Sequence, residues 1–290
     1  MREDLAYDNI MKKGTGRKRC LMVIFAILMI FIAIWPQFVL AEKVVKNIAA
    51  EGSCAIVGMS AEQCQLIALQ RARVSAIEQA AGVKVTSSTV VTNMALTVDF
   101  IKTYAKGFIV KEKVEWLPLD QYQKDKSTPP IPEYKVRIVA VVSIPEPKIK
   151  PIGIKAKTNS LIYKNGEHAV IEVKTRRPAK VGIFNITADD KVTMLFPNEY
   201  EKENIVSGDK PLIFPTKISK VELIMHTLPD HKRDVEAFFV VVMDSSYVRD
   251  FTNIYTPLTQ MSFAQFFQTY SGIADYCEDY ILAYEVLGPE

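Results

Sequence analysis

Histidines and clustered carboxylates are the residues in this sequence that could hold a metal ion. The three histidines are His168, His226 and His231. They lack the one-turn spacing of a ligand pair on a helix, and the closer two flank a predicted turn. The acidic segment 275–279 lacks the alternating oxygen ligands and the glycine of a calcium loop. We therefore expect no metal site and no bound cofactor.

Nucleophilic side chains also lack the neighbours that catalysis needs. Cys277 has a tyrosine before it and two acidic residues after it, and such neighbours raise a thiol pKa instead of lowering it. Ser60 lies in the segment GMSAE, which lacks the final glycine of a nucleophile elbow. The stretch 14–18 has glycines beside basic residues, but its spacing is not that of a phosphate-binding loop. These patterns predict a protein that is not an enzyme.

Two further cysteines, Cys54 and Cys64, lie close together in the sequence. In an oxidising compartment they could form a disulfide that closes a short loop between a predicted strand and the following helix. Such a bond would stabilise the fold by about 2–3 kcal/mol. Two buried free thiols explain the same residues equally well, and the sequence leaves both alternatives open.

One loop has the features of an interaction site. Phe196, Pro197 and Asn198 end a predicted strand in a sharp turn, and the loop that continues to Pro215 is the longest of the C-terminal half. Binding residues favour loops of this kind on a rigid scaffold. Proline and asparagine are also ordinary turn formers, so the alternative is that these residues serve the turn alone.

The elements that would position these residues begin after an apolar leader. Basic residues precede an uncharged run at 21–35, which is the pattern of a secretory signal. Small or aliphatic side chains then occupy the positions before a cleavage site, so we predict cleavage between Ala41 and Glu42. The alternative is an uncleaved anchor, because the segment 21–41 is long enough to span a bilayer. Both alternatives place the rest of the chain outside the cytoplasm, either in the periplasm or anchored at the inner membrane.

Charge balance excludes some classes of partner. The chain has 36 Lys and Arg and 33 Asp and Glu, and because the leader holds six and three of them, residues 42–290 carry 30 of each sign. A nucleic-acid partner would need an excess of phosphate-neutralising cations, which this balance does not offer. The balance also gives no support to a polybasic membrane-binding surface. Contact with a membrane is therefore expected only through the leader, if it stays uncleaved.

Residues 42–146 have the pattern of an α/β module in which a helix packs on an antiparallel sheet. The helix is predicted to start at Ser60, whose capping-box spacing to Gln63 satisfies free backbone donors, and to stop at Gly82. Its predicted buried face carries Ile67, Val74, Ile77 and Ala81. Strands are predicted at 43–56, 83–91, 108–116 and 136–144, and a short helix at 94–104.

A proline-rich linker at 147–154 separates this module from a C-terminal half that is mainly β. The predicted strands are 169–175, 180–187, 191–196, 212–214, 218–225, 235–243 and 280–287. The apolar density of 238–242 predicts a strand covered on both faces, which is typical of the centre of a β-sandwich. One short helix follows Ser262. Its aromatic stripe is Phe263, Phe266, Phe267 and Tyr270, which at helical spacing favours core packing over ligand binding.

The predicted fold class is therefore α+β: an N-terminal α/β module, then a β-sandwich over residues 155–290 with one short C-terminal helix. Two resemblances add to this prediction. The N-terminal half carries AEGSCAI, then RARVSAIEQAAGVKVTSSTVV and YKVRIVAVVS. It resembles the N-terminal domain of the flagellar assembly protein T family and related exported lipoproteins. The second half carries YKNGEHAVIEVKTRRPAKVGIFNITADDKVTMLFPN and resembles the bacterial domain of unknown function 4384 from about residue 155 to the C-terminus.

What the resemblances imply is assembly or binding without transferable catalytic residues. We accordingly expect a non-catalytic extracytoplasmic binding or assembly adaptor of the bacterial cell envelope, whose partner is an envelope protein or a glycan. The alternative is a periplasmic hydrolase or ligand sensor whose site is assembled from residues distant in sequence. That alternative requires a deep pocket with ionisable groups of shifted pKa.

Overall fold

The structure, a computed structural model, describes residues 43–82, 107–208 and 210–289. The predicted leader with its cleavage site at Ala41 and Glu42, the predicted strand at 83–91 and the predicted helix at 94–104 lie outside the described residues. Residues 42–290 form one compact unit. In it an N-terminal sheet packs against a helix, and several mainly-β sheets with a short C-terminal helix follow, so the predicted α+β class is confirmed.

The N-terminal sheet is antiparallel and is built around its long central strand. Its strands are β1 (Lys43–Ala55), β2 (Phe108–Trp116), β3 (Asp120–Tyr122) and β4 (Ile131–Ile144). Their order is β1-β4-β2, and β3 also pairs with β4. The strands predicted at 108–116 and 136–144 are confirmed.

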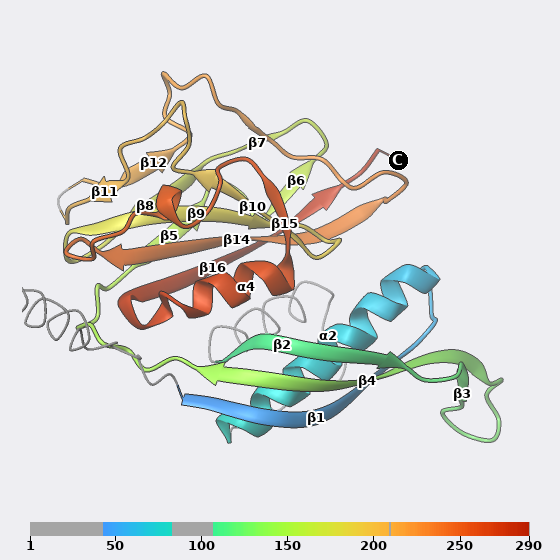
Figure 1. Cartoon of the computed structure of the whole chain (residues 1–290). Coiled ribbons are helices and arrows are strands. Elements are labelled where there is room, and N and C mark those ends of the chain that lie inside the picture. Colours follow the sequence, from blue (N-terminus) through green and yellow to red (C-terminus); the bar gives the residue numbers. More distant parts are fainter. Residues whose placement is uncertain (1–42, 83–106, 209, 290) are drawn as a thin grey trace, which may run out of the picture. The chain divides into compact units, whose positions relative to one another are not determined.

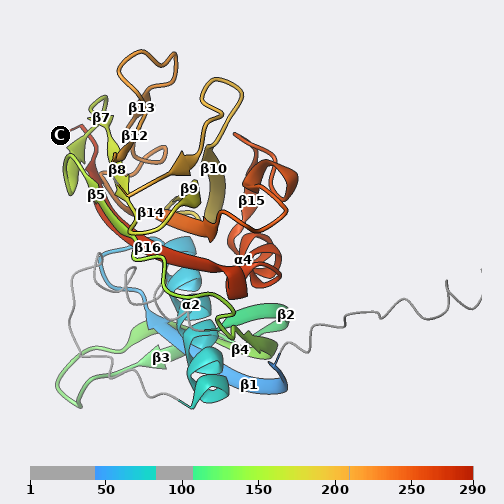
Figure 2. The same ribbon diagram turned by 90° about the vertical axis from the view of Figure 1, so that its left-hand side faces the viewer.

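Helix α2 (Ala61–Ala81) covers one face of this sheet, as Figures 1 and 2 show. Ser60 Oγ accepts the Gln63 N–H at 3.2 Å, and Gln63 Oε1 accepts the Ser60 N–H at 3.1 Å. Gly82 ends the helix with a φ of 67°. The predicted capping box and left-handed stop are therefore both confirmed.

The buried face of α2 differs from the predicted one. The helix turns a row of small side chains to the sheet: Cys64, Ala68, Ala72 and Ala76. Of the predicted face, Ile77 is buried, whereas Ile67 and Val74 are only partly buried. Gly52 of β1 gives the physical reason, because a Cβ at this position would lie 2.1 Å from the Ala68 carbonyl oxygen. Small residues on both sides let the helix backbone approach the strand more closely than isoleucine would.

The close approach predicts that Gly52→Ala destabilises the protein. The added methyl has no free volume, because it meets helix backbone that cannot move aside as a side chain could. We expect the free energy of unfolding to fall by at least about 2 kcal/mol in urea denaturation. Gly272→Ala is the matched control, because Gly272 has an ordinary φ of −71° and a Cβ there meets only the Thr269 carbonyl at 3.5 Å. Equal stability of the two variants would contradict the close packing.

The described C-terminal half consists mainly of strands, many of them short, with one α-helix and two short 3-10 helices. The early strands are β5 (Lys155–Thr158), β6 (Ile162–Lys164), β7 (His168–Ala169), β8 (Ile171–Lys174), β9 (Ala179–Ile186) and β10 (Lys191–Phe196). The later elements are β11 (Ile205–Val206), β12 (Leu212–Phe214), β13 (Leu223–Ile224), β14 (Arg233–Asp244), β15 (Gln260–Ser262), α4 (Phe263–Ser271) and β16 (Cys277–Leu287). The main sheet has the order β15-β10-β9-β14-β16-β6, with β11 also on β9, and a second sheet has the order β12-β8-β5.

Strand β14 is buried on both faces, as the apolar density of 238–242 predicts. Phe238 and Val240 belong to the core shared with the second sheet, which includes Ile171 of β8. Phe239 and Val241 point the other way, into a core that includes helix α4. The main sheet is therefore the middle layer, with apolar side chains on each side.

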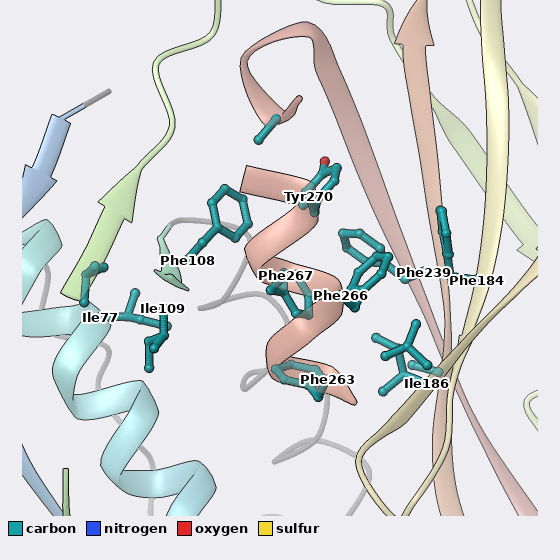
Figure 3. Close-up of a cluster of buried hydrophobic side chains, with 14 of the residues drawn as sticks. Ile77, Phe108, Ile109, Phe184, Ile186, Phe239, Phe263, Phe266, Phe267 and Tyr270 are labelled. Carbon is teal, nitrogen blue, oxygen red and sulfur yellow. The ribbon is translucent and has the colours of Figure 1, made fainter. Parts of the chain in front are cut away.

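Helix α4 supplies the aromatic side of that second core (Figure 3). The four stripe residues, Phe263, Phe266, Phe267 and Tyr270, are all buried. Phe266 packs on Phe184 of β9 with ring centroids 4.8 Å apart, and Phe267 stacks on Phe108 of β2 at 5.9 Å. The prediction of core packing for this stripe is confirmed. The same cluster includes apolar residues of both halves of the chain.

The linker has no regular structure, as its prolines predict, but the C-terminal strand holds it in place. The Glu278 carboxylate accepts the backbone N–H groups of Ile152, Gly153 and Ile154 at 2.7, 2.9 and 3.2 Å. Asp275 accepts the Glu146 N–H at 2.8 Å. Two carboxylates of the acidic segment therefore fix the path by which the chain enters β5.

A buried ion-pair network joins the two halves. Arg73 of α2 pairs with Glu112 of β2 at 2.6 Å and with Asp190 of the β9–β10 turn at 3.0 Å. Gln70 donates to Asp190 as well, at 3.4 Å. Burial raises the pKa of the Asp190 carboxyl despite the lowering effect of the Arg73 charge. The network costs desolvation energy and is tolerable only while all three charged partners are present.

We expect Arg73→Met to destabilise the chain strongly, by about 3–5 kcal/mol, because two carboxylates would lose their buried counterion. The midpoint of urea unfolding measures this. Arg137→Met is the matched control, since Arg137 pairs with Glu51 at 2.7 Å but both side chains are about half exposed. Water screens that pair, so its loss should barely move the midpoint. Similar shifts of the midpoint in the two variants would show that the buried Arg73 network contributes no more to stability than the exposed pair does.

Candidate functional site

The loop predicted for interaction runs from residue 196 to Pro215 and lies at one edge of the C-terminal half, where it follows β10 and includes β11 and β12 (Figure 1). Together with Thr216, and without residue 209, which lies outside the described residues, it is called loop 196–216. The structure buries Phe196, Pro197 and Asn198. The Phe196 ring packs on Phe214 with centroids 5.1 Å apart. These residues therefore anchor both ends of the loop to the core of the sandwich.

Asn198 organises the first turn of the loop. Its side-chain amide donates to the Leu195 carbonyl at 2.7 Å, and its Oδ1 accepts the N–H groups of Tyr200 and Glu201, each at 2.9 Å. The Glu201 carboxylate in turn accepts the Thr216 N–H at 3.2 Å. The turn is thus held by side chains whose polar atoms are already engaged, and its exposed residues are left to make outside contacts.

Three large apolar side chains of the loop are exposed among charged and polar ones. Tyr200 is 57 % exposed, Ile205 of β11 65 % and Ile213 of β12 43 %. Glu199 beside them is exposed as well. Large apolar side chains that are exposed on an ordered turn are typical of a binding surface.

Two open hollows are lined in part by residues of segment 196–203. The first, of about 340 Å³, is the β11 hollow; its apolar wall includes Ile205, Val206, Leu212 and Ile213, and its polar residues include Glu203 and Lys210. The second, of about 400 Å³, is the turn hollow, which is lined by Pro197, Asn198, Glu199, Lys202, Asp250, Thr252 and Pro257. The predicted loop residues thus border both hollows, although none of the three is exposed.

A buried polar triad in the main sheet contains a carboxyl group with a raised pKa. Glu236 of β14 accepts the hydroxyl proton of Tyr284 of β16 at 2.6 Å, and Asn185 of β9 lies 3.3 Å from the same carboxylate oxygen. Burial raises the pKa of Glu236 to about 7, with a smaller contribution from the Asp234 charge. Sequence reasoning missed this triad, although a glutamate on the core-facing side of an apolar strand is a signal that could have found it.

The raised pKa makes a pH-dependent stability prediction. Because Glu236 binds its proton more tightly when folded, its contribution is present below about pH 4.5 and is lost as the pH rises through 7. The shift corresponds to about 3 kcal/mol at most. We expect Glu236→Gln to be more stable than wild type at pH 8 and to show a smaller loss of stability between pH 5 and 8 in urea unfolding. Glu203→Gln, on the exposed loop, is the control and should leave the profile unchanged.

Neither remaining candidate for chemistry adopts a catalytic arrangement. His231 Nδ1 lies 2.6 Å from Asp234 Oδ1, but the second oxygen of Asp234 accepts the Leu228 N–H at 2.6 Å, so the pair closes a turn. Burial raises the pKa of the Cys277 thiol, and the Asp279 charge adds to this. The direction predicted for Cys277 is confirmed, although burial is a larger cause than its acidic neighbour.

Cys54 and Cys64 are both buried and carry free thiols in the structure. Cys64 donates to the Cys54 carbonyl oxygen at 2.8 Å. Burial, and then the hydrogen bond with Cys64, raise the pKa of Cys54 to about 12. The two thiols are therefore neighbours, and their pairing under oxidising conditions stays a prediction.

Among residues 43–82, 107–208 and 210–289, no group of three or more His, Cys, Asp or Glu side chains could hold a metal ion. No helix within these same ranges is long and apolar enough to cross a membrane.

Comparison with known proteins identifies one domain. Residues 162–227 match the family described as Domain of unknown function (DUF4384). The match covers β6 to β13 and therefore the whole loop and the β11 hollow, whereas the resemblance predicted from sequence extended to the C-terminus. The comparison supports no family for the N-terminal half. No curated protein matches the chain.

Proposed function

We propose that this chain is a non-catalytic extracytoplasmic binding or assembly module of the bacterial cell envelope, and that the exposed side chains of loop 196–216 contact its partner, an envelope protein or a glycan. The observation that carries the proposal is the contrast within this loop. Its buried residues hold a rigid turn, and Tyr200, Ile205 and Ile213 project apolar surface beside two open hollows.

The DUF4384 match places the loop and the strands from β6 to β13 within one domain. The N-terminal resemblance to the flagellar assembly protein T family supports the assembly part of the proposal. The apolar leader supports an extracytoplasmic location, either free in the periplasm after cleavage or attached to the inner membrane.

The rival function, a hydrolase or ligand sensor, requires ionisable groups of shifted pKa at a pocket. Among the described residues, three carboxyl groups have a raised pKa: Asp190, Glu236 at about 7 and Asp279 at about 6. Asp190 is paired with Arg73, and the other two are hydrogen bonded to the core tyrosines Tyr284 and Tyr270. None of the three lines either hollow. This arrangement favours a structural role for the carboxyl groups and a binding role for the loop.

Site-specific photo-crosslinking in cells tests the proposal with the full chain. A photoreactive residue at Tyr200 should give a defined adduct, whereas one at Tyr122, which is also exposed but lies on β3, should not. Ile213→Glu should abolish the Tyr200 adduct, because it places a charge in the apolar wall of the β11 hollow. Ile224→Glu is the matched control, since Ile224 is 45 % exposed against 43 % for Ile213. The proposal fails if Tyr200 gives no adduct or if both glutamate variants behave alike.

A further inference from the structure

The outer face of the β12-β8-β5 sheet gathers positive charge that composition alone does not reveal. In β5 and β8, Ala156 and Val173 point toward the core, so the alternate residues point to solvent. These outward residues include Lys155 and Lys157 of β5 and Lys174 of β8. Arg176 continues the row after Lys174, and we call these four residues the cationic face.

The cross-strand register places like charges directly opposite each other. Lys155 pairs with Lys174 across the ladder, and Lys157 pairs with Glu172. Glu172 is the single acidic residue among them, and it bridges Lys157 and Lys174 at 3.0 Å each. Like charges opposite each other on a sheet are destabilising. Glu172 offsets part of this repulsion, but one carboxylate faces four cations, so the face keeps a net positive charge that attracts an anion.

Arg176 joins this row through Gly153 of the linker. The Arg176 N–H donates to the Ile152 carbonyl at 3.1 Å, which brings Arg176 against Gly153. Gly153 has a φ of 77°, and a Cβ there would lie 2.8 Å from Arg176 Cδ. The missing side chain leaves room for the Arg176 stem to pack against the linker. The linker, held by Glu278, thus helps to position the fourth cation.

We propose that the cationic face binds the surface of a membrane that contains anionic phospholipids, which goes beyond the partner contact assigned to loop 196–216. Charge complementarity points to an anion, and three features point to a lipid surface. The face is an exposed sheet, three of its four cations are lysines on flexible stems, and its outward row ends on Ile213 of β12, opposite Glu172. A glycan would require aromatic stacking platforms, and the outward residues of the described strands β5, β8 and β12 include none.

Vesicle co-sedimentation tests this with residues 42–290, which form one compact unit separate from the leader. The chain should bind vesicles of phosphatidylglycerol mixed with phosphatidylcholine and not vesicles of phosphatidylcholine alone, and the binding should weaken as salt is raised. Each lysine near an anionic surface strengthens partitioning about fivefold. The triple variant with Lys155→Gln, Lys157→Gln and Lys174→Gln should therefore partition to anionic vesicles roughly 100-fold more weakly than wild type.

The matched control changes three exposed lysines of the N-terminal half: Lys111→Gln, Lys113→Gln and Lys124→Gln. This variant loses the same number of positive charges and should bind anionic vesicles as wild type does. Lys155→Glu separates a binding role from a structural one, because it replaces the repulsion with Lys174 by an attraction. This variant should bind vesicles more weakly than wild type and unfold at the same or a higher urea concentration.

Three results would overturn the proposal. The first is that the chain does not bind anionic vesicles. The second is that the two triple variants lose vesicle binding to the same extent. The third is competition by inorganic phosphate present at the same phosphate concentration as the lipid, since that would mark a discrete phosphate site. Vesicles contain no protein or glycan partner, so the outcome is independent of the crosslinking at Tyr200.

Discussion

The structure depends on one sheet that is buried on both faces. Strand β14 sends Phe238 and Val240 into the core under the second sheet, and Phe239 and Val241 into the core around α4. A strand of this kind cannot tolerate polar residues on either side without partners. The polar side chain of Glu236 is accordingly hydrogen bonded, and its core-facing neighbours are apolar. The aromatic row of α4 packs on Phe239 of β14, and Phe108 of the N-terminal module packs on the same row, so the position of α4 follows from the β14 layer.

Local signals in the sequence predicted much of this fold, because they depend on near neighbours. The Ser60 capping box, the Gly82 stop, the strand at 191–196 and the helix after Ser262 were each predicted correctly. The buried face of α2 was not predicted correctly. Alanine is only weakly apolar, so an analysis of hydrophobic periodicity assigns the buried face to isoleucine in preference to alanine. The partner that makes alanine the better choice is Gly52, which lies on a different element. Strands β5, β6, β11 and β15 were missed for a related reason: they are two to four residues long and are defined by their pairing.

The loop shows how far sequence reasoning reaches toward a site. The chain leaves the sheet at three turn residues, Phe196, Pro197 and Asn198. In the structure these residues stabilise the turn. The residues that face outward, such as Tyr200 and Ile213, have no pattern that distinguishes them from core residues. Their exposure follows from strand register and from the hydrogen bonds of Asn198, and both depend on the tertiary structure. A turn motif therefore locates the loop without identifying the side chains that meet a partner.

Strand β12 connects the two surfaces assigned to the C-terminal half. Ile213 lines the β11 hollow and also lies opposite Glu172, at the end of the outward row that carries Lys157. A ligand on one surface therefore changes the surroundings of the other without any movement of the backbone. The hollows beside the loop carry charge of both signs, from Glu199 and Glu203 and from Lys202 and Lys210, so the loop surface is charge-balanced whereas the cationic face is not.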